Sequence, residues 1–507
     1  MEEIPKLLLG YFNATNNLVS GITKYNSDFF MPFLTATFYF NNVEMSGVHK
    51  DSPLEQWIAY MKLLEFNLEI LSRYHSGSVD ALEDFIEKES KELSLAIYNT
   101  VFNRDGEKLT DFFQRQFDII EGVTQDFPKA VKDIEPEYGF HFERGDQKPF
   151  AETERFLVYP VIPTDSKITI DKTAKPVLII PPFVLGSNIL GFLPKENRSY
   201  AHCFANQGIP TYIRIMKDIN TTPAFQVMTM EEDAIDTRFF CQKIMEKHGK
   251  KVTLNGYCQG GYSALCNILS GELDSVVDAL ITCVAPMDGT RSKGLGNFLR
   301  ALPTRFNNLL YGTKTLPNGN KVADGNLMGW VYKLKSIEHE APLVSFFRDM
   351  FMVAQAEEKS VKLSKTALAL NYWLKNERTD IPLAITAMSF ASYNVPVKED
   401  GTLPVTMFGK PLNFKTIEDK KIPWLLCYGE NDDLVEKETA LAPLDYIKVE
   451  TTPFPKGHVA IATSWSHPES AYALHTRFGK DKQYRGPVRF QMDLDTPIVT
   501  SEKDKKS

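Results

Sequence analysis

The sequence has few cysteines and no pattern among them that is typical of metal binding. Six occur in 507 residues, without a C-x-x-C pair or regular spacing: Cys203, Cys241, Cys258, Cys266, Cys283 and Cys427. In a long intracellular chain such cysteines are free thiols, mostly buried as small hydrophobic residues. We therefore expect no disulfide framework, no zinc site and no other bound metal.

The chain also lacks a long apolar run and a basic N-terminal segment. No stretch reaches the about 18 apolar residues that a transmembrane helix needs. The opening "MEEIPKLLLG" has Glu2 and Glu3 where a signal peptide has Lys or Arg, and no cleavage site follows. We predict a cytoplasmic protein with no membrane span.

Positive charge is not in excess. The formal net charge is −8, whereas proteins that bind nucleic acid usually carry a basic stripe, so we expect no nucleic-acid partner. The chain is 43% hydrophobic and 24% charged, which is typical of a globular core rather than of disorder. Its length allows about two to four domains of ~100–200 residues each.

Residues 1–150 have the pattern of a helical N-terminal domain. Ser52, Pro53 and Glu55 open a predicted helix with a capping box and proline at the first helical position. Apolar residues then recur at helical spacing, at Trp57, Met61, Leu64, Leu68 and Leu71. We interpret this stripe as core or inter-helix packing, with a partner-binding face as the alternative. The segments 78–102 and 109–127 have the pattern of further amphipathic helices.

From about residue 150 short apolar runs alternate with helical periodicity. The predicted buried strands are 176–183, 210–215, 251–257, 276–286 and 422–432, with a helix over 230–249. Such alternation predicts a mostly parallel sheet covered on both faces, with active groups beyond the C-terminal strand ends.

The domain prediction follows from where this alternation holds. We predict that the sheet-containing core is formed by residues 151–288 and 416–490. Residues 289–415 are predicted to form a cap or lid inserted between these two parts, and residues 491–507 a disordered tail.

The stretch "LNGYCQGGYSAL" places Cys258 between a predicted strand and a predicted helix. In α/β-hydrolases G-x-S-x-G forms a nucleophile elbow in this context, and the nucleophile's neighbours at −2 and +2 must be small. Gly256, Gly260 and Gly261 supply small residues around Cys258. The start of the helix favours a thiolate, and the backbone N–H of Gln259 would face a developing oxyanion. The alternative is one more buried thiol in a glycine-rich turn, which is how we interpret Cys266 and Cys283.

A nucleophile needs a base, and the base needs an acid that orients it. In the chain order nucleophile, acid, base, we assign Asp432 in "GENDDLV" and His458 in "PKGHVA". Asp288 and Asp433 are rival acids, and His467 is a rival base in the setting of an exposed loop.

A second oxyanion donor should come from the loop after an earlier strand. In "IIPPFVLG" the two prolines have no N–H, so the donor is the N–H of Phe183 or Val184, and we favour Val184.

Several segments, in order, resemble the polyhydroxyalkanoate synthases, which include the poly(3-hydroxybutyrate) polymerases. The similar segments are "KPVLIIPPF", "NRSYAHCFANQGIPTYIRI", the cysteine box "LNGYCQGGYSAL", "PVTMFGKPLNFKTIEDKKIPWLLCYGENDDLV" and "GHVA", which together span about residues 150–475. The resemblance implies an α/β-hydrolase core with nucleophile Cys258, acid Asp432 and base His458. Two stretches depart from the family pattern. "FVLGSNILGF" stands where the family usually has an Asn-Lys-Tyr-Tyr run, and Asp433 stands where it often has His.

The resemblance implies an acyltransferase that polymerises hydroxyacyl-CoA through an acyl-cysteine and releases CoA. Its partners would be hydroxyacyl-CoA, the growing polyester chain and a polymer-granule surface, with no cofactor beyond the CoA thioester substrate. We also expect a homodimer. The cysteine box is similar to that of dienelactone hydrolases as well, which are much shorter.

Cysteine suits acyl transfer because a thiolate that attacks a thioester keeps the acyl group activated for a second transfer. Two other hypotheses stay open at this point. One is a hydrolase of polyester, ester or thioester bonds on the same scaffold. The other is a non-catalytic scaffold or granule-associated protein, against which the set Cys258, Asp432 and His458 argues.

Overall fold

The computed structural model describes most of the chain as two compact units. The described residues are 12, 15–25, 27, 52–144, 146–296, 299, 312–335, 337–358 and 363–495. The helical unit comprises Met1–Pro136 and Leu327–Asn376, and the sheet unit comprises Glu137–Asn326 and Glu377–Ser507. Within the described ranges, no helix combines the length and the apolar character that a bilayer span requires.

The sheet unit is built on an eight-stranded sheet with the order β1-β2-β4-β3-β5-β6-β12-β13. Strand β2 runs antiparallel to its neighbours β1 and β4, and all the other pairs are parallel. The strands are β1 (Ala151–Glu152), β2 (Phe156–Pro160), β3 (Val177–Ile180), β4 (Thr211–Met216), β5 (Val252–Tyr257), β6 (Val277–Cys283), β12 (Trp424–Gly429) and β13 (Glu450–Phe454). The five strands predicted from apolar runs are therefore confirmed as β3, β4, β5, β6 and β12.

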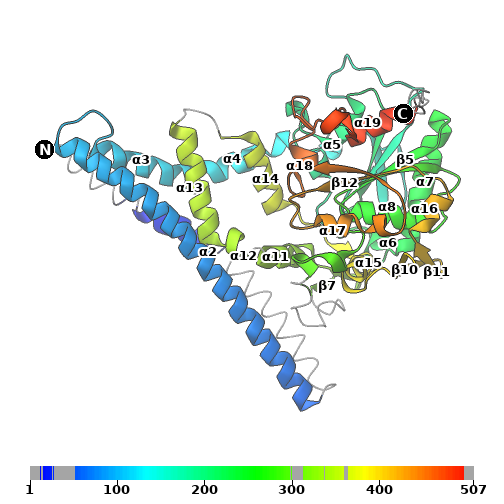
Figure 1. Ribbon diagram of the computed structural model, residues 1–507, viewed down its shortest axis with the longest axis horizontal. Coiled ribbons are helices and arrows are strands. Elements are labelled where there is room, and N and C mark those ends of the chain that lie inside the picture. The colour runs from blue at the N-terminus through cyan, green and yellow to red at the C-terminus, as the bar shows by residue number, and fades with distance from the viewer. Residues whose placement is uncertain are drawn as a thin grey trace, which may run out of the picture. The chain divides into compact units, whose positions relative to one another are not determined.

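Helices cover both faces of this sheet, as expected for parallel strands joined by crossovers. Helices α7 and α8 pack together on one face, and α5 and α19 lie on the other (Figure 1). The helices of this unit are α5 (Tyr200–Ala205), α6 (Pro223–Gln226), α7 (Met230–His248), α8 (Gln259–Leu269), α15 (Leu383–Asn394), α16 (Lys415–Asp419), α17 (Lys437–Ala440), α18 (Ala460–Thr463) and α19 (Pro487–Asp493). The predicted helix over 230–249 is confirmed as α7, which starts at a Thr229–Glu232 capping box and ends at Gly249 with φ 68°.

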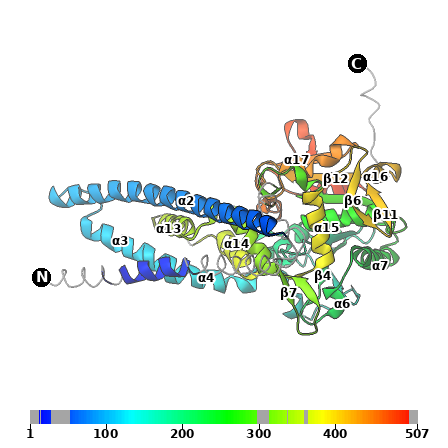
Figure 2. The same cartoon turned by 90° about the horizontal axis from the view of Figure 1, so that it is seen from below.

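Three small sheets and short 3-10 turns complete the unit. The strands are β7 (Thr313–Thr315), β8 (Lys321–Ala323) and β9 (Ile381–Pro382), β10 (Thr402–Met407) with β11 (Lys410–Asn413), and β14 (Arg477–Phe478) with β15 (Tyr484–Arg485). Helix α15 packs against β8, β9 and β10. Figure 2 shows α15 in the same unit as strand β11 of the β10–β11 hairpin.

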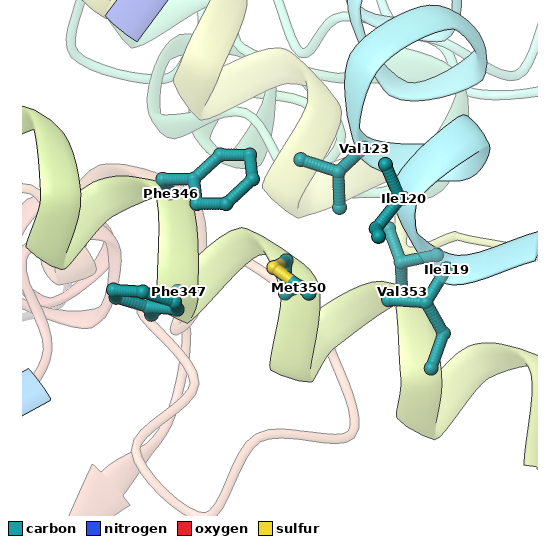
Figure 3. Close-up of a cluster of buried hydrophobic side chains, with 7 residues drawn as sticks. All are labelled: Ile119, Ile120, Val123, Phe346, Phe347, Met350 and Val353. Atoms are coloured by element: carbon teal, nitrogen blue, oxygen red, sulfur yellow. The ribbon is translucent and has the colours of Figure 1, made fainter. Parts of the chain in front are cut away.

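The helical unit contains one helix where two were expected. The predicted helix that opens at Ser52 and the predicted helix over 78–102 are parts of a single helix, α2 (Pro53–Val101). It begins at the predicted Ser52–Glu55 capping box. The other elements are α3 (Leu109–Glu121), the π-turn η1 (Gly122–Asp126), α4 (Phe127–Asp133), α11 (Gly325–Lys335), α12 (Ile337–Glu340), α13 (Pro342–Glu358) and α14 (Lys365–Asn376). Its core joins α3 and η1 to α13 through the buried side chains Ile119, Ile120, Val123, Phe346, Phe347, Met350 and Val353 (Figure 3).

The packing expected for the apolar stripe of α2 is wrong. The side chains of Trp57, Met61, Leu64, Leu68 and Leu71 are 61%, 42%, 41%, 58% and 40% exposed. Helical periodicity marks an apolar face but does not say which element covers it. The first buried side chain among the described residues of α2 is Ile70.

The expected insertion over 289–415 is not a single body. Residues 327–376 group with the N-terminal helices, whereas 289–326 and 377–415 group with the sheet. The helical grouping on the N-terminal side ends at Pro136 rather than at residue 150. The expected disordered tail also starts too early, because α19 runs to Asp493 and Lys250 Nζ lies 2.6 Å from Asp495 Oδ1. The rest of that tail, from 496 onward, lies outside the described residues.

A buried ion pair connects the strands to the helices of this unit. Arg214 on β4 and Asp233 on α7 are 2% and 1% exposed, and Arg214 Nη1 lies 2.7 Å from Asp233 Oδ1. Asp233 Oδ2 also accepts hydrogen bonds from Ser263 Oγ and Asn267 Nδ2 of α8. One carboxylate thus joins β4, α7 and α8.

We expect Asp233→Ala to destabilise the sheet unit by about 3–5 kcal/mol, because it leaves the Arg214 guanidinium buried without its partner. Glu246→Ala on the same helix removes a half-exposed ion pair with Lys243 and should change the free energy of unfolding by less than about 1 kcal/mol. Urea unfolding of both variants makes the comparison. Equal losses of stability in the two would contradict the importance of this network.

Candidate active site

Cys258 lies in a sharp turn between β5 and α8. Its φ is 52° and its ψ is −125°, a conformation that non-glycine residues adopt only where the surroundings impose it. The residue is 9% exposed. Cys266 and Cys283 are fully buried in α8 and β6, and burial raises the pKa of the Cys266 thiol well above its usual range. Cys258 is therefore the cysteine that the fold places at a strained turn from a strand to a helix, as the sequence predicted.

The glycines around Cys258 are required by the close approach of the backbone. A Cβ on Gly256 would lie 2.4 Å from Gly261 Cα, and a Cβ on Gly260 would lie 2.4 Å from the carbonyl oxygens of Ile180 and Pro181. A Cβ on Gly261 would lie 2.6 Å from Ala285 Cβ. All three separations are shorter than real Cβ contacts, so the turn excludes side chains at these positions.

Asp432 and His458 come together beyond the ends of β12 and β13. His458 Nδ1 and Asp432 Oδ2 are 2.8 Å apart, and both side chains are nearly inaccessible to solvent. Asp432 Oδ1 accepts hydrogen bonds from the backbone N–H groups of Leu434 (2.9 Å) and Val435 (2.8 Å), which fix the carboxylate. The backbone is held as well, because Tyr257 Oη donates to the carbonyl oxygen of His458 at 2.7 Å.

The charges around His458 favour its protonated form. Burial lowers the pKa of His458, but Asp432 and, after it, Cys258 raise it, and the pKa lies well above its usual range. Asp432 and Cys258 thus both interact with the imidazole ring of His458. A side-chain hydrogen bond with Cys258 is one of the interactions that raise the pKa of His458, whose Nε2 is buried, so this ring can exchange a proton with a group that reacts at the sulfur.

The three rival residues are placed elsewhere. Asp288 Oδ1 accepts hydrogen bonds from the N–H and hydroxyl of Thr290, and its Oδ2 lies 3.2 Å from Arg291 Nε. Asp433 is exposed, and His467 Nδ1 accepts a hydrogen bond from the N–H of Glu469. Of the candidate acids, only Asp432 contacts His458 by hydrogen bond.

The two segments expected to supply oxyanion donors lie side by side. Gln259 is the first residue of α8, where N–H groups have no partner within the helix. The close approach of Gly260 to Ile180 and Pro181 brings the loop that contains Val184 next to this helix start. Val184 is buried, and its carbonyl oxygen accepts a hydrogen bond from the N–H of Thr379 at 3.2 Å.

Three contacts near the site were missed in the sequence. They are the bond from Tyr257 to His458, the bond from Gln259 Nε2 to Ser389 Oγ at 2.6 Å on α15, and the bonds that Glu377 accepts near the Val184 loop. Each joins segments far apart in the chain, and no local pattern marks them. Within the described ranges, no group of three or more His, Cys, Asp or Glu residues has the arrangement of a metal site.

The strand order, the single antiparallel strand β2 and the turn between β5 and α8 define an α/β-hydrolase fold, in which Cys258 lies at that turn. No protein-family profile and no curated protein matches this chain.

Solved structures that resemble the chain are esterases and hydrolases of low identity. An esterase from the planctomycete Thermogutta terrifontis is 12% identical, with 71% of this chain and 98% of that chain covered and a TM-score of 0.33. A 2-hydroxy-6-oxo-6-phenylhexa-2,4-dienoate hydrolase from Rhodococcus is 12% identical, covers 63% of this chain and 93% of that chain, and has a TM-score of 0.32. A lipase-esterase related protein from Clostridium acetobutylicum is 12% identical, covers 61% and 95%, and has a TM-score of 0.34. The fold assignment rests on the sheet order of this chain itself.

We expect Asp432→Asn to lower the pKa of His458, because it removes the largest interaction that raises it. Asp433→Asn, a change at the exposed neighbouring carboxylate, should leave that pKa unchanged. Histidine ring ¹⁵N shifts followed across pH, and assigned with His458→Ala, make the measurement. An unchanged pKa in Asp432→Asn would contradict the pairing.

The raised pKa of His458 also makes the free energy of unfolding depend on pH. The folded-state pKa lies above the unfolded value of about 6.5. The interaction therefore stabilises the fold fully below that pH, and its contribution is lost as pH rises through the folded-state pKa.

Proposed function

We propose that this chain is an enzyme that forms a covalent acyl thioester on Cys258. The observation that carries the proposal is the hydrogen bond between His458 and Asp432 next to a cysteine held at a positive φ. A cysteine at this turn, a histidine whose ring interacts with that cysteine, and a buried carboxylate that binds the histidine are the parts that nucleophilic acyl transfer requires.

In the first step, Cys258 Sγ attacks the carbonyl carbon of the acyl donor. The oxyanion that forms accepts hydrogen bonds from the N–H groups of Gln259 and Val184. When the donor is a CoA thioester, the C–S bond to CoA breaks, and CoA leaves after accepting the proton held on His458 Nε2. The acyl group stays on Cys258 as a thioester, so it keeps its activation.

In the second step, a hydroxyl group attacks the acyl-cysteine. His458 Nε2 accepts the hydroxyl proton, the new C–O bond forms, and the bond to Cys258 Sγ breaks. Asp432 stabilises the imidazolium in this step. When the attacking hydroxyl belongs to a 3-hydroxyacyl group, each cycle adds one ester unit to a polyester.

We propose (R)-3-hydroxyacyl-CoA as the donor and polyester growth as the outcome, on the resemblance of residues 150–475 to polyhydroxyalkanoate synthases. The contact of α15 with Gln259 and the low exposure of Cys258 support an acyl-enzyme that is shielded from water. A chain tethered through Cys258 would bring the protein to a polymer-granule surface. The homodimer and the cytoplasmic location stay predictions, and the CoA thioester is the substrate rather than a cofactor.

Hydrolysis is the second candidate outcome. The same three residues on this fold cleave ester or thioester bonds when water replaces the hydroxyl acceptor.

We expect purified protein to release CoA from 3-hydroxybutyryl-CoA in step with insoluble ester, while free 3-hydroxybutyrate stays low. Mass spectrometry should find the acyl adduct on Cys258 and on neither of the buried thiols Cys266 and Cys283. Cys258→Ala is the control and should release no CoA. Stoichiometric free hydroxy acid without oligomer would assign the chain to hydrolysis, and an adduct on another cysteine would overturn the nucleophile.

We expect His458→Ala to slow acylation itself by about 10²–10⁴-fold, since it removes the general acid and base. Asp432→Asn should acylate faster than His458→Ala and lose mainly the second step, because a hydroxyl needs its proton removed whereas a thiolate does not. Rapid-quench measurement of acyl-enzyme and product separates the two steps, with Asp433→Asn as the control. Equal acylation defects in His458→Ala and Asp432→Asn would contradict this division of roles.

A further inference from the structure

The loop that follows β3 is the part of the proposed site whose position depends on residues far away in the chain. Pro181 and Pro182 have no N–H, so Phe183 and Val184 offer the first donors after the strand. Both are buried. The backbone before them meets the start of α8 at Gly260, at a separation that admits no Cβ. A small shift of this loop would therefore change where the N–H of Val184 lies relative to Cys258.

Residues 377–379 hold this loop at two points. The N–H of Thr379 donates to the carbonyl oxygen of Val184 at 3.2 Å. At the other end of the loop, Asn188 Nδ2 donates to Glu377 Oε1 at 2.8 Å. Asn188 Oδ1 in turn accepts a hydrogen bond from the N–H of Phe140 at 3.2 Å, so both ends of its amide are engaged.

Glu377 completes a hydrogen-bonded group inside the sheet unit. Its Oε2 accepts a hydrogen bond from Tyr138 Oη at 3.0 Å, and the Tyr138 side chain is 1% exposed. Burial raises the pKa of Glu377, while Asn188, Tyr138, Arg378 and His141 lower it, and the net direction is upward. A carboxylate in such a place needs hydrogen-bond donors, and here one of its two donors is the side chain that ends the Val184 loop.

The arrangement serves the loop rather than the sheet. The hydrogen bonds described for the Glu377 carboxylate come from Tyr138 and Asn188, which both lie outside the strands of the main sheet. Glu377 also follows directly after Asn376, the last residue of α14 and of the helical unit in chain order. The loop after β3 is thus anchored by the segment through which the chain enters the sheet unit again.

We propose that Glu377, acting through Asn188, is a positioning residue that holds the Val184 N–H where the oxyanion forms. The inference rests on the proposed acyl-enzyme at Cys258 but not on the identity of the acyl donor. It requires hydrogen-bond acceptance by residue 377 and not its negative charge. A glutamine can accept from Asn188 through its oxygen and donate through its amide to the oxygen of Tyr138.

The test compares two reactions of the same sulfur. p-Nitrophenyl acetate acylates a cysteine through an oxyanion, whereas iodoacetamide alkylates it at a saturated carbon and places no charge on an oxygen. In single-turnover experiments, Glu377→Ala should slow the burst of p-nitrophenolate by about 10–100-fold, in line with the cost of misplaced groups in active sites. The rate of Cys258 alkylation should change by less than about twofold, because this reaction forms no oxyanion for the Val184 N–H to bind. Glu377→Gln should acylate within about threefold of the wild type, since it keeps the acceptor oxygen.

Asn188→Ala provides a second route should Glu377→Ala not fold. It should reproduce the selective loss of acylation, and the double variant should be no slower than the worse single variant, because both act through one contact. The matched control is Asp236→Ala on α7, which removes another buried carboxylate of the sheet unit, one that accepts its hydrogen bonds from Arg155 and not from the Val184 loop. It should lose stability without a selective loss of acylation.

Four results would overturn the inference: equal losses of acylation and alkylation, no loss of either, failure of glutamine to restore acylation, or a wild type that releases no p-nitrophenolate from Cys258. A wild type that reacts with p-nitrophenyl acetate but not with 3-hydroxybutyryl-CoA would remove only the proposed substrate. The two failures are therefore distinguishable.

Discussion

The close approach of backbone to backbone around Cys258 is the constraint on which the site depends. Strand β5, helix α8 and the loop after β3 meet at separations that leave no room for a Cβ on Gly256 or Gly260. This contact holds Cys258 at a positive φ and lifts its sulfur to the strand end. It also sets the loop of Val184 beside the start of α8. The close packing around Gly256, Gly260 and Gly261 thus positions both the proposed nucleophile and the two proposed oxyanion donors. Among the described cysteines, only Cys258 has a positive φ.

A second constraint is electrostatic. Asp432 is buried, and its two oxygens are shared between the His458 ring and two backbone N–H groups. A buried carboxylate is tolerated when its hydrogen bonds are met, and here one of them goes to a ring that can carry positive charge. The same interaction raises the pKa of His458 and orients its ring. The charge distribution therefore favours an imidazolium beside the sulfur, which is the state that cysteine acyl transfer begins from.

The segment inserted between β6 and β12 serves two different parts of the molecule. Residues 327–376 complete the core of the helical unit, in which Phe346, Phe347 and Met350 pack against α3 and η1. The remainder returns to the sheet unit, where Ser389 of α15 contacts Gln259 and Glu377 holds the loop after β3. The chain thus leaves the sheet unit and enters it again next to groups that bear on the proposed chemistry. The exposed apolar face of α2 belongs to the helical unit alone.

The sequence by itself determined the strands, the parallel sheet and the turn at Cys258, and it limited the candidate acids to Asp432, Asp288 and Asp433 and the candidate bases to His458 and His467. Each of these follows from local signals: apolar runs bounded by turns, glycines at fixed offsets, and the chain order of nucleophile, acid and base. The tertiary structure decided among the rival acids, because only distance separates Asp432 from Asp288, which is engaged by Thr290 and Arg291. It also decided that the Trp57 stripe is exposed, how residues 289–415 divide, and that Glu377 meets Asn188 across 189 residues. These are contacts between distant segments, and their energy depends on packing partners that no local pattern specifies.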